Sequence, residues 1–351
     1  MCPALLKSVF ESESLLVDQP TAPVIVVGLP RSGSSFLSHV LSCMDNWYIF
    51  DDLYPRQKAA SLGIYGDFNL ADRPDLLREY VNSLTWQLRS KIKFEENFEV
   101  PDLSLEDTFV MEAKMLEAFA SQSSLTWHQV LEEWITRLAQ HSQKFRWGYK
   151  TPQDFMHMDE LTDAFPGVRF IYILRDPRQV MRSFKNLPRV KTSGTEDGES
   201  RQYHPLIYSL YWKTAYEEVQ AFVRRGRAPV TTVRFEDLVA QPELIATRLA
   251  EFLDTTVQGS VVPQSVNSSF SKGTSYDLTP TEVTICERVA GAQMEAAGYA
   301  LSHPSPRLRD GWDLLKTSSE FTAYQIHRAI TDSRGRASIK SFVKSIGKST
   351  R

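Results

Sequence analysis

The stretch VIVVGLPRSGSSFL, residues 24–37, limits the possible folds of this chain more than any other feature. Its β-branched run ends at Gly28, and Gly33 closes the turn before Ser34 and Ser35 begin a helical pattern. Two glycines at this spacing let successive backbone N–H groups converge on one anion, and a helix that starts there points its positive end at the same place. The stretch therefore predicts a buried strand, a phosphate-binding loop and a helix.

The position of the loop's cation limits the chemistry. A loop that binds ATP or GTP has a lysine directly after the second glycine, together with an aspartate elsewhere for Mg²⁺. Ser34 occupies the lysine position here, and the cation of the loop, Arg31, lies upstream of Gly33. We find no candidate for the magnesium aspartate in the strands that the sequence reveals. An ATPase is therefore disfavoured, and we expect no metal site.

Strands alternate with amphipathic helices along the chain. Two further runs, residues 168–174 and 229–235, read as buried strands, and residues 76–92 and 125–143 have the apolar spacing of helices. This alternation is typical of a parallel sheet covered on both faces. We predict an α/β fold with a P-loop-type parallel sheet flanked by helices. A single domain would span residues 1–351, with a core at about 22–278, a helical insertion at about 55–147 and a basic tail at about 305–351.

Composition narrows the function classes. Hydrophobic residues make up 42% of the chain and the net charge is −3, so no basic field indicates nucleic-acid binding. Three scattered cysteines without a CxxC pair suggest neither zinc nor a disulfide framework. No apolar run is long enough for a signal peptide or a membrane span, so we expect a cytoplasmic protein without an integral membrane segment. We interpret the basic tail as a solvated helix and a frayed end, with a membrane surface or an acidic partner as the alternative.

The loop PRSGSSFL resembles the 5′-phosphosulfate loop of sulfotransferases that use 3′-phosphoadenosine-5′-phosphosulfate (PAPS). In FIYILRDPRQVMRSF, Arg175 and Ser183 match the spacing of that family's 3′-phosphate segment. The segment WGYKTPQDFMHMDEL is similar to the Lys-Thr-Pro segment of the branch with bacterial enzymes and tyrosylprotein sulfotransferases. VRFEDLVAQP looks like the family's Tyr-Glu-Asp-Leu segment, with Phe235 in place of Tyr. FSKGTSYDL resembles a shortened Arg-Lys-Gly loop, with Ser271 in place of Arg. The matches follow the family's order.

The resemblance implies roles for the matching residues. Arg31 and Lys150 would be catalytic and would stabilise the transferring group. The tyrosylprotein branch has an acidic base about twenty positions after the loop cation, where this chain has Asp51 and Asp52. We assign the base to Asp52, with Arg56 nearby to orient either an acidic acceptor or the aspartate itself. The alternative is that one of these aspartates caps the turn before Pro55. The implied cofactor-binding residues are Arg31, Ser32, Gly33, Ser34, Ser35, Phe36, Arg175, Ser183, Lys272 and Gly273.

The resemblance further implies a PAPS-dependent sulfotransferase. Such an enzyme transfers a sulfuryl group to a hydroxyl or amine of an acceptor by in-line displacement and releases 3′-phosphoadenosine-5′-phosphate. We expect a bacterial enzyme of secondary metabolism that acts on a small-molecule acceptor. The helical insertion would form the acceptor pocket. A homodimer is possible. The alternatives are a protein or carbohydrate acceptor, a small-molecule kinase, and a non-catalytic nucleotide-binding P-loop protein. Lys150 argues against a pure binding protein, and a kinase would leave Arg175 and Ser183 without a 3′-phosphate.

Overall fold

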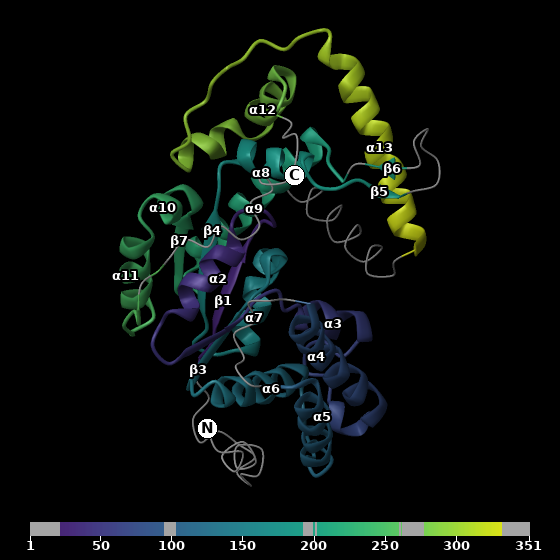
Figure 1. Ribbon diagram of the computed structural model, residues 1–351, viewed down its shortest axis with the longest axis vertical. Helices are drawn as coiled ribbons and strands as arrows, with labels where there is room; N and C mark the ends of the chain where they lie inside the picture. The colour runs from purple at the N-terminus through teal and green to yellow at the C-terminus, as the bar shows by residue number, and fades with distance from the viewer. Residues whose placement is uncertain are drawn as a thin grey trace.

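The central feature of the computed structural model is a sheet of five parallel strands (Figure 1). The structure describes residues 22–94, 103–191, 199–200, 202–259, 261 and 277–331. The strand order is β2-β3-β1-β4-β7, so β1 lies in the middle. The strands are β1 (Val24–Gly28), β2 (Trp47–Phe50), β3 (Arg146–Lys150), β4 (Arg169–Leu174) and β7 (Val230–Arg234). The predicted α/β fold is confirmed, and β2 and β3 are strands that the sequence patterns did not reveal.

The two faces of the sheet are both buried, as expected for parallel strands. Val24 and Val26 of β1 pack with the helices of one face, while Ile25 and Val27 belong to the core on the other face. The first face is covered by α2 (Ser34–Ser42), α10 (Phe235–Ala240) and α11 (Pro242–Phe252). The second face is covered by most of the remaining helices. Because β1 is buried on both faces, its sequence is a continuous apolar run.

Helices fill the chain between β2 and β3 and lie at the lower end of Figure 1. They are α3 (Pro55–Leu62), the 3-10 helix η1 (Leu70–Asp72), α4 (Pro74–Phe94), α5 (Leu105–Phe119) and α6 (Trp127–His141). Ser104 and Asp107 form a reciprocal capping box that starts α5. The apolar positions of α6 form one stripe that buries Trp134 completely. The helical patterns predicted for residues 76–92 and 125–143 are therefore confirmed as α4 and α6.

The remaining described helices follow β3 in the chain. They are η2 (Pro152–His157), α7 (Met158–Ala164), α8 (Pro177–Lys185), α9 (Pro205–Arg225), α12 (Pro280–Ala296) and α13 (Asp310–Thr331). Helix α12 packs along α9 (Figure 1). Between α8 and α9 lies a short antiparallel pair, β5 (Val190–Lys191) with β6 (Glu199–Ser200). Among the described residues, no helix combines the length and the apolar character that crossing a bilayer requires.

Candidate functional site

The loop between β1 and α2 depends on Gly33. Its φ is +90°, and a Cβ atom there would lie 2.1 Å from the ring of Phe235. Any side chain would meet both backbone strain and an aromatic ring. Gly33 is also the N-cap of α2, whose first N–H groups have no partner within the helix. The predicted turn between a strand and a helix is therefore present, with Ser34 and Ser35 in the first turn of α2 and Ser32 buried beside it, and anion binding by this turn stays a prediction.

Lys150 is the cation nearest to the start of α2. Its side chain is only 2% exposed, and its Nζ donates a hydrogen bond to Ser35 Oγ at 3.0 Å. The same Nζ lies 2.9 Å from Asp51 Oδ1 and 2.8 Å from Asp52 Oδ1. The sheet order explains this meeting, because β2 and β3 are neighbours and both aspartates directly follow β2. One ammonium group therefore joins the loop to the two candidate bases.

The charge of Asp52 is held by its neighbours. Partial burial disfavours its ionised form, but the ion pair with Lys150 and hydrogen bonds from Lys150 and from Tyr54 outweigh burial and lower its pKa. The hydroxyl of Tyr54 donates to Asp52 Oδ1 at 2.9 Å, and its own pKa is raised by burial and by the carboxylates around it. Tyr54 is also the N-cap of α3, which has no side-chain cap. The alternative that Asp51 or Asp52 caps the turn before Pro55 is therefore wrong.

Arg56 does not orient Asp52, in contrast to the sequence-based expectation. Its Nε lies 2.9 Å from Asp154 Oδ1, and its Nη1 lies 3.8 Å from Glu160. Asp154 is completely buried and also accepts a hydrogen bond from Thr151 Oγ1 at 2.8 Å. Arg56 and Asp154 therefore form a buried ion pair that joins α3 to the segment directly after Lys150.

Arg175 and Arg31 meet on the opposite side of β1. Arg175 follows β4, and its Nη1 donates to the carbonyl oxygen of Arg31 at 2.8 Å. Its guanidinium lies 4.2 Å from the ring centroid of Phe235. Arg31 Nε donates to Ser183 Oγ at 3.0 Å, so the loop cation lies beside the predicted 3′-phosphate residues. Burial lowers the pKa of both guanidinium groups, yet arginine keeps its charge in proteins.

This arginine pair has the donors that an anionic cofactor needs. Arg175 Nε is buried and has no hydrogen-bond partner among the described residues. A buried donor without a partner costs free energy, which an incoming phosphate oxygen would recover. Ser183 is buried next to Arg31. Phe36 lies on the first turn of α2, and its side chain packs against the core. Lys272 and Gly273 lie outside the described residues.

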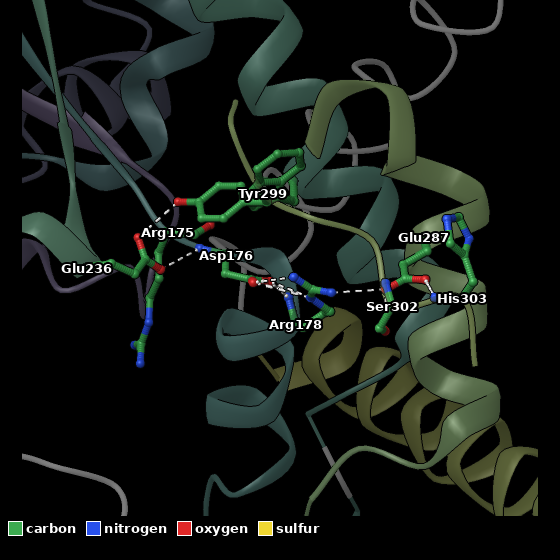
Figure 2. Close-up of polar contacts among 9 residues, drawn as sticks. Arg175, Asp176, Arg178, Glu236, Glu287, Tyr299, Ser302 and His303 are labelled. Atoms are coloured by element: carbon green, nitrogen blue, oxygen red, sulfur yellow. Dashed lines mark hydrogen bonds and ion pairs between the residues drawn. The ribbon is translucent and has the colours of Figure 1, made fainter. Parts of the chain in front are cut away.

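A polar network behind Arg175 was not predicted from the sequence (Figure 2). Glu236 accepts hydrogen bonds from the N–H of Asp176 and from the hydroxyl of Tyr299. Arg178 pairs with Asp176 and, at 3.0 Å, with Glu287. Arg182 pairs with Asp277 at 2.8 Å.

Comparisons with known proteins identify the family of this chain. Residues 23–259 match the profile of the sulfotransferase family. A sulfotransferase domain from the olefin synthase of Synechococcus PCC 7002 is 18% identical with a TM-score of 0.44, over 86% of this chain and 97% of that one. A sulfotransferase domain from the curacin biosynthetic pathway is 17% identical with a TM-score of 0.46, over 80% of this chain and 98% of that one. Sulfotransferase STF9 from Mycobacterium avium is 13% identical with a TM-score of 0.43, over 85% of this chain and 81% of that one. A search of curated proteins finds no match.

Proposed function

Because this chain belongs to the sulfotransferase family, we propose that it transfers a sulfuryl group from PAPS to a hydroxyl or amine of a small-molecule acceptor. The observation that carries this proposal is the ammonium of Lys150, which lies within 3.0 Å of Ser35, Asp51 and Asp52. A cation that joins a phosphate-binding turn to a carboxylate suits a transfer reaction, because the turn holds the donor and the carboxylate can accept the acceptor's proton.

The donor would be held at its two ends by different groups. The N–H groups and hydroxyls of Ser34 and Ser35 would bind the 5′-phosphate. Arg175 and Ser183 would bind the 3′-phosphate, and the unpartnered Arg175 Nε supplies a free donor for it. Arg31 contacts Ser183 through its side chain and Arg175 through its carbonyl oxygen, so it would act between the two ends. These groups distinguish PAPS from ATP, which lacks a 3′-phosphate.

The transfer itself would use Lys150 and Asp52. The acceptor oxygen or nitrogen forms a bond to sulfur while the bond from sulfur to the 5′-phosphate oxygen breaks, and the acceptor's proton passes to Asp52. Lys150 offers its positive charge to the peripheral and leaving oxygens, where negative charge accumulates. The helices α3 to α6, which join the strands that carry these two residues, would form the acceptor pocket.

The shared ammonium couples these two roles. In the resting arrangement Lys150 keeps Asp52 ionised and lowers its pKa, which makes the carboxylate a weak base. When the ammonium turns toward the phosphosulfate, Asp52 loses the ion pair and hydrogen bond of Lys150, while its partial burial and the hydrogen bond from Tyr54 persist. Losing a positive partner raises the pKa of a carboxylate from its resting value. Asp52 would therefore become a stronger base at the moment when the donor is engaged.

Calorimetric titration tests the donor assignment. The purified protein is titrated with 3′-phosphoadenosine-5′-phosphate, and in parallel with ADP and ATP without magnesium. We expect micromolar binding of the bisphosphate alone, reduced at least tenfold in Arg175→Ala, because a lost charge-assisted hydrogen bond costs about 1.5–3 kcal/mol. Equal or tighter binding of ATP would contradict the proposal and favour a kinase. Turnover is then measured as release of the bisphosphate from PAPS with a panel of small hydroxyl and amine acceptors.

A further inference from the structure

One peptide unit at the end of β4 is held at both of its polar groups by side chains. The carbonyl oxygen of Arg175 accepts a hydrogen bond from Trp212 Nε1 at 2.8 Å. The N–H of Asp176, in the same peptide unit, donates to Glu236 Oε1 at 3.0 Å (Figure 2). This unit is the junction between β4 and α8, and its orientation determines where the Arg175 side chain starts. Fixing both polar groups therefore fixes the backbone position from which the Arg175 side chain extends.

Glu236 is itself held by a residue from the far end of the chain. Its Oε2 accepts a hydrogen bond from the hydroxyl of Tyr299 at 3.0 Å, and Tyr299 is only 5% exposed. Burial and the adjacent carboxylate raise the pKa of Tyr299 well above its usual value, so the hydroxyl remains a donor. The guanidinium of Arg234 lies 4.4 Å from the centroid of the tyrosine ring. Tyr299 lies beyond residue 259, where the family match ends.

A second set of contacts ties the same region of the chain to this junction. Asp176 caps the start of α8 through the N–H of Arg178, whose guanidinium also contacts the Asp176 carboxylate. Arg178 Nη1 lies 3.0 Å from Glu287 on α12. Glu287 accepts hydrogen bonds from the N–H groups of Ser302 and His303 at 2.9 and 2.8 Å (Figure 2). The segment from α12 to His303 is therefore joined to the β4–α8 junction at two points.

We propose that Glu236 is the positioning residue for Arg175, supported by Tyr299, and that this clamp sets the selectivity of the site for a 3′-phosphate. The inference rests on the proposed function, in which Arg175 binds that phosphate. Glu236 acts on Arg175 in two ways: it accepts the hydrogen bond of the junction's N–H group, and its charge acts on the Arg175 guanidinium. The turn after α12 is thereby a working part of the cofactor site.

Binding of two ligands that differ only in the 3′-phosphate tests this role. Affinities for adenosine 3′,5′-bisphosphate and for AMP are measured by calorimetry in wild type and variants. We expect Glu236→Ala to lower the affinity for the bisphosphate about tenfold, which is roughly the value of one hydrogen bond to a charged group. The affinity for AMP should fall less than twofold. Glu236→Gln keeps an acceptor for the Asp176 N–H and should stay within about threefold of wild type. Tyr299→Phe should fall between the two.

Two controls separate positioning from general damage. Asp237→Ala removes an exposed acid from the same helical turn and should leave both affinities unchanged. In an Arg175→Ala background, Glu236→Ala should cause no further loss of bisphosphate affinity, because its effect passes through the missing guanidinium. Equal losses for both ligands, an unchanged ratio, or a Glu236→Gln variant as impaired as Glu236→Ala would overturn the proposal.

The same titrations distinguish this inference from the function on which it rests. A wild-type protein that binds AMP as tightly as the bisphosphate contradicts the assignment of the 3′-phosphate site, and the positioning role falls with it. A wild type that prefers the bisphosphate and loses that preference in Arg175→Ala, but keeps it in Glu236→Ala, refutes the positioning role alone. Thermal unfolding of each variant identifies any loss of folded protein.

Discussion

Replacing Lys150 with methionine removes the ammonium that joins Asp51, Asp52 and Ser35 while keeping a long apolar side chain. The Lys150 side chain is only 2% exposed, and its Nζ lies 2.8–3.0 Å from three oxygen atoms. If the ammonium stabilises the transferring group, its loss should cost about 3–4 kcal/mol of transition-state stabilisation, or roughly 10²- to 10³-fold in kcat. Affinity for the spent bisphosphate should fall less than kcat, because the 5′-phosphate loses one cation while the 3′-phosphate residues are untouched.

The same variant should weaken a pH effect on stability. In the wild type the folded-state pKa of Asp52 is below its unfolded value, so its contribution is present above the unfolded pKa and is lost as pH falls through the folded pKa. Without Lys150, the ion pair and hydrogen bond that lower this pKa are gone, while the hydrogen bond from Tyr54 and the charge of Lys91 remain, so the folded-state pKa rises toward the unfolded value. The stabilising contribution above the unfolded pKa then shrinks. The Tm deficit of the variant should therefore be larger at pH 5 than at pH 3.

The assays are bisphosphate release from PAPS under saturating acceptor, and calorimetric unfolding at the two pH values. Lys91→Met is the comparison variant, since Lys91 is a second buried lysine, on α4, with its Nζ 5.7 Å from the Phe50 ring centroid. Its charge also lowers the pKa of Asp52, so this variant separates the electrostatic effect on Asp52 from the contact that Lys150 makes with Ser35. Its kcat should stay within about threefold of wild type. A Lys150→Met variant that keeps kcat within tenfold would refute the catalytic role, and a Tm deficit independent of pH would refute the electrostatic link to Asp52.

Two further predictions concern residues that shape the site. Gly33→Ala places a Cβ 2.1 Å from the Phe235 ring and should weaken bisphosphate binding at least tenfold. Its control is Gly63→Ala, at φ +71° with no atom within 4 Å of the added Cβ, which should cost only backbone strain of about 1–3 kcal/mol and bind the bisphosphate normally. Calorimetric titration measures the binding and urea unfolding measures the stability of both variants. Asp154→Ala leaves the buried guanidinium of Arg56 with only its 3.8 Å contact to the half-exposed Glu160, and should lower the free energy of unfolding by about 3–5 kcal/mol. Glu160→Gln should cost less than about 1 kcal/mol, and equal losses would contradict this account.

The sequence predicted the central part of the fold because its signals were local. The β-branched run before Gly28 and the apolar runs at residues 168–174 and 229–235 each form one strand, and the periodic stretches form α4 and α6. Strands β2 and β3 escaped detection because WYIF and RWGYK are short, aromatic and flanked by helices. In such runs, apolar periodicity cannot distinguish a strand from a buried helical turn.

The partners within the site could not be predicted for a different reason. The contact between Lys150 and Asp52 joins residues that are adjacent only because β2 and β3 pair, which depends on the whole sheet. The expectation that Arg56 orients Asp52 was wrong because it rested on their proximity in the sequence. In the structure the guanidinium of Arg56 pairs with Asp154 instead. Nor could spacing reveal the link between Glu236 and Tyr299, since the chain between them returns through α12.

The strand order also places the two groups of site residues on opposite sides of β1. On one side, Lys150 ends β3 and Asp52 follows β2, and the helices α3 to α6 lie between those two strands in the chain. On the other side, β4 and β7 carry the groups around Arg175. If the proposed function holds, a chimaera that exchanges residues 55–145 for those of a relative would bring in a new acceptor pocket already attached to Lys150 and Asp52, while the strands beside the proposed 3′-phosphate site stayed unaltered.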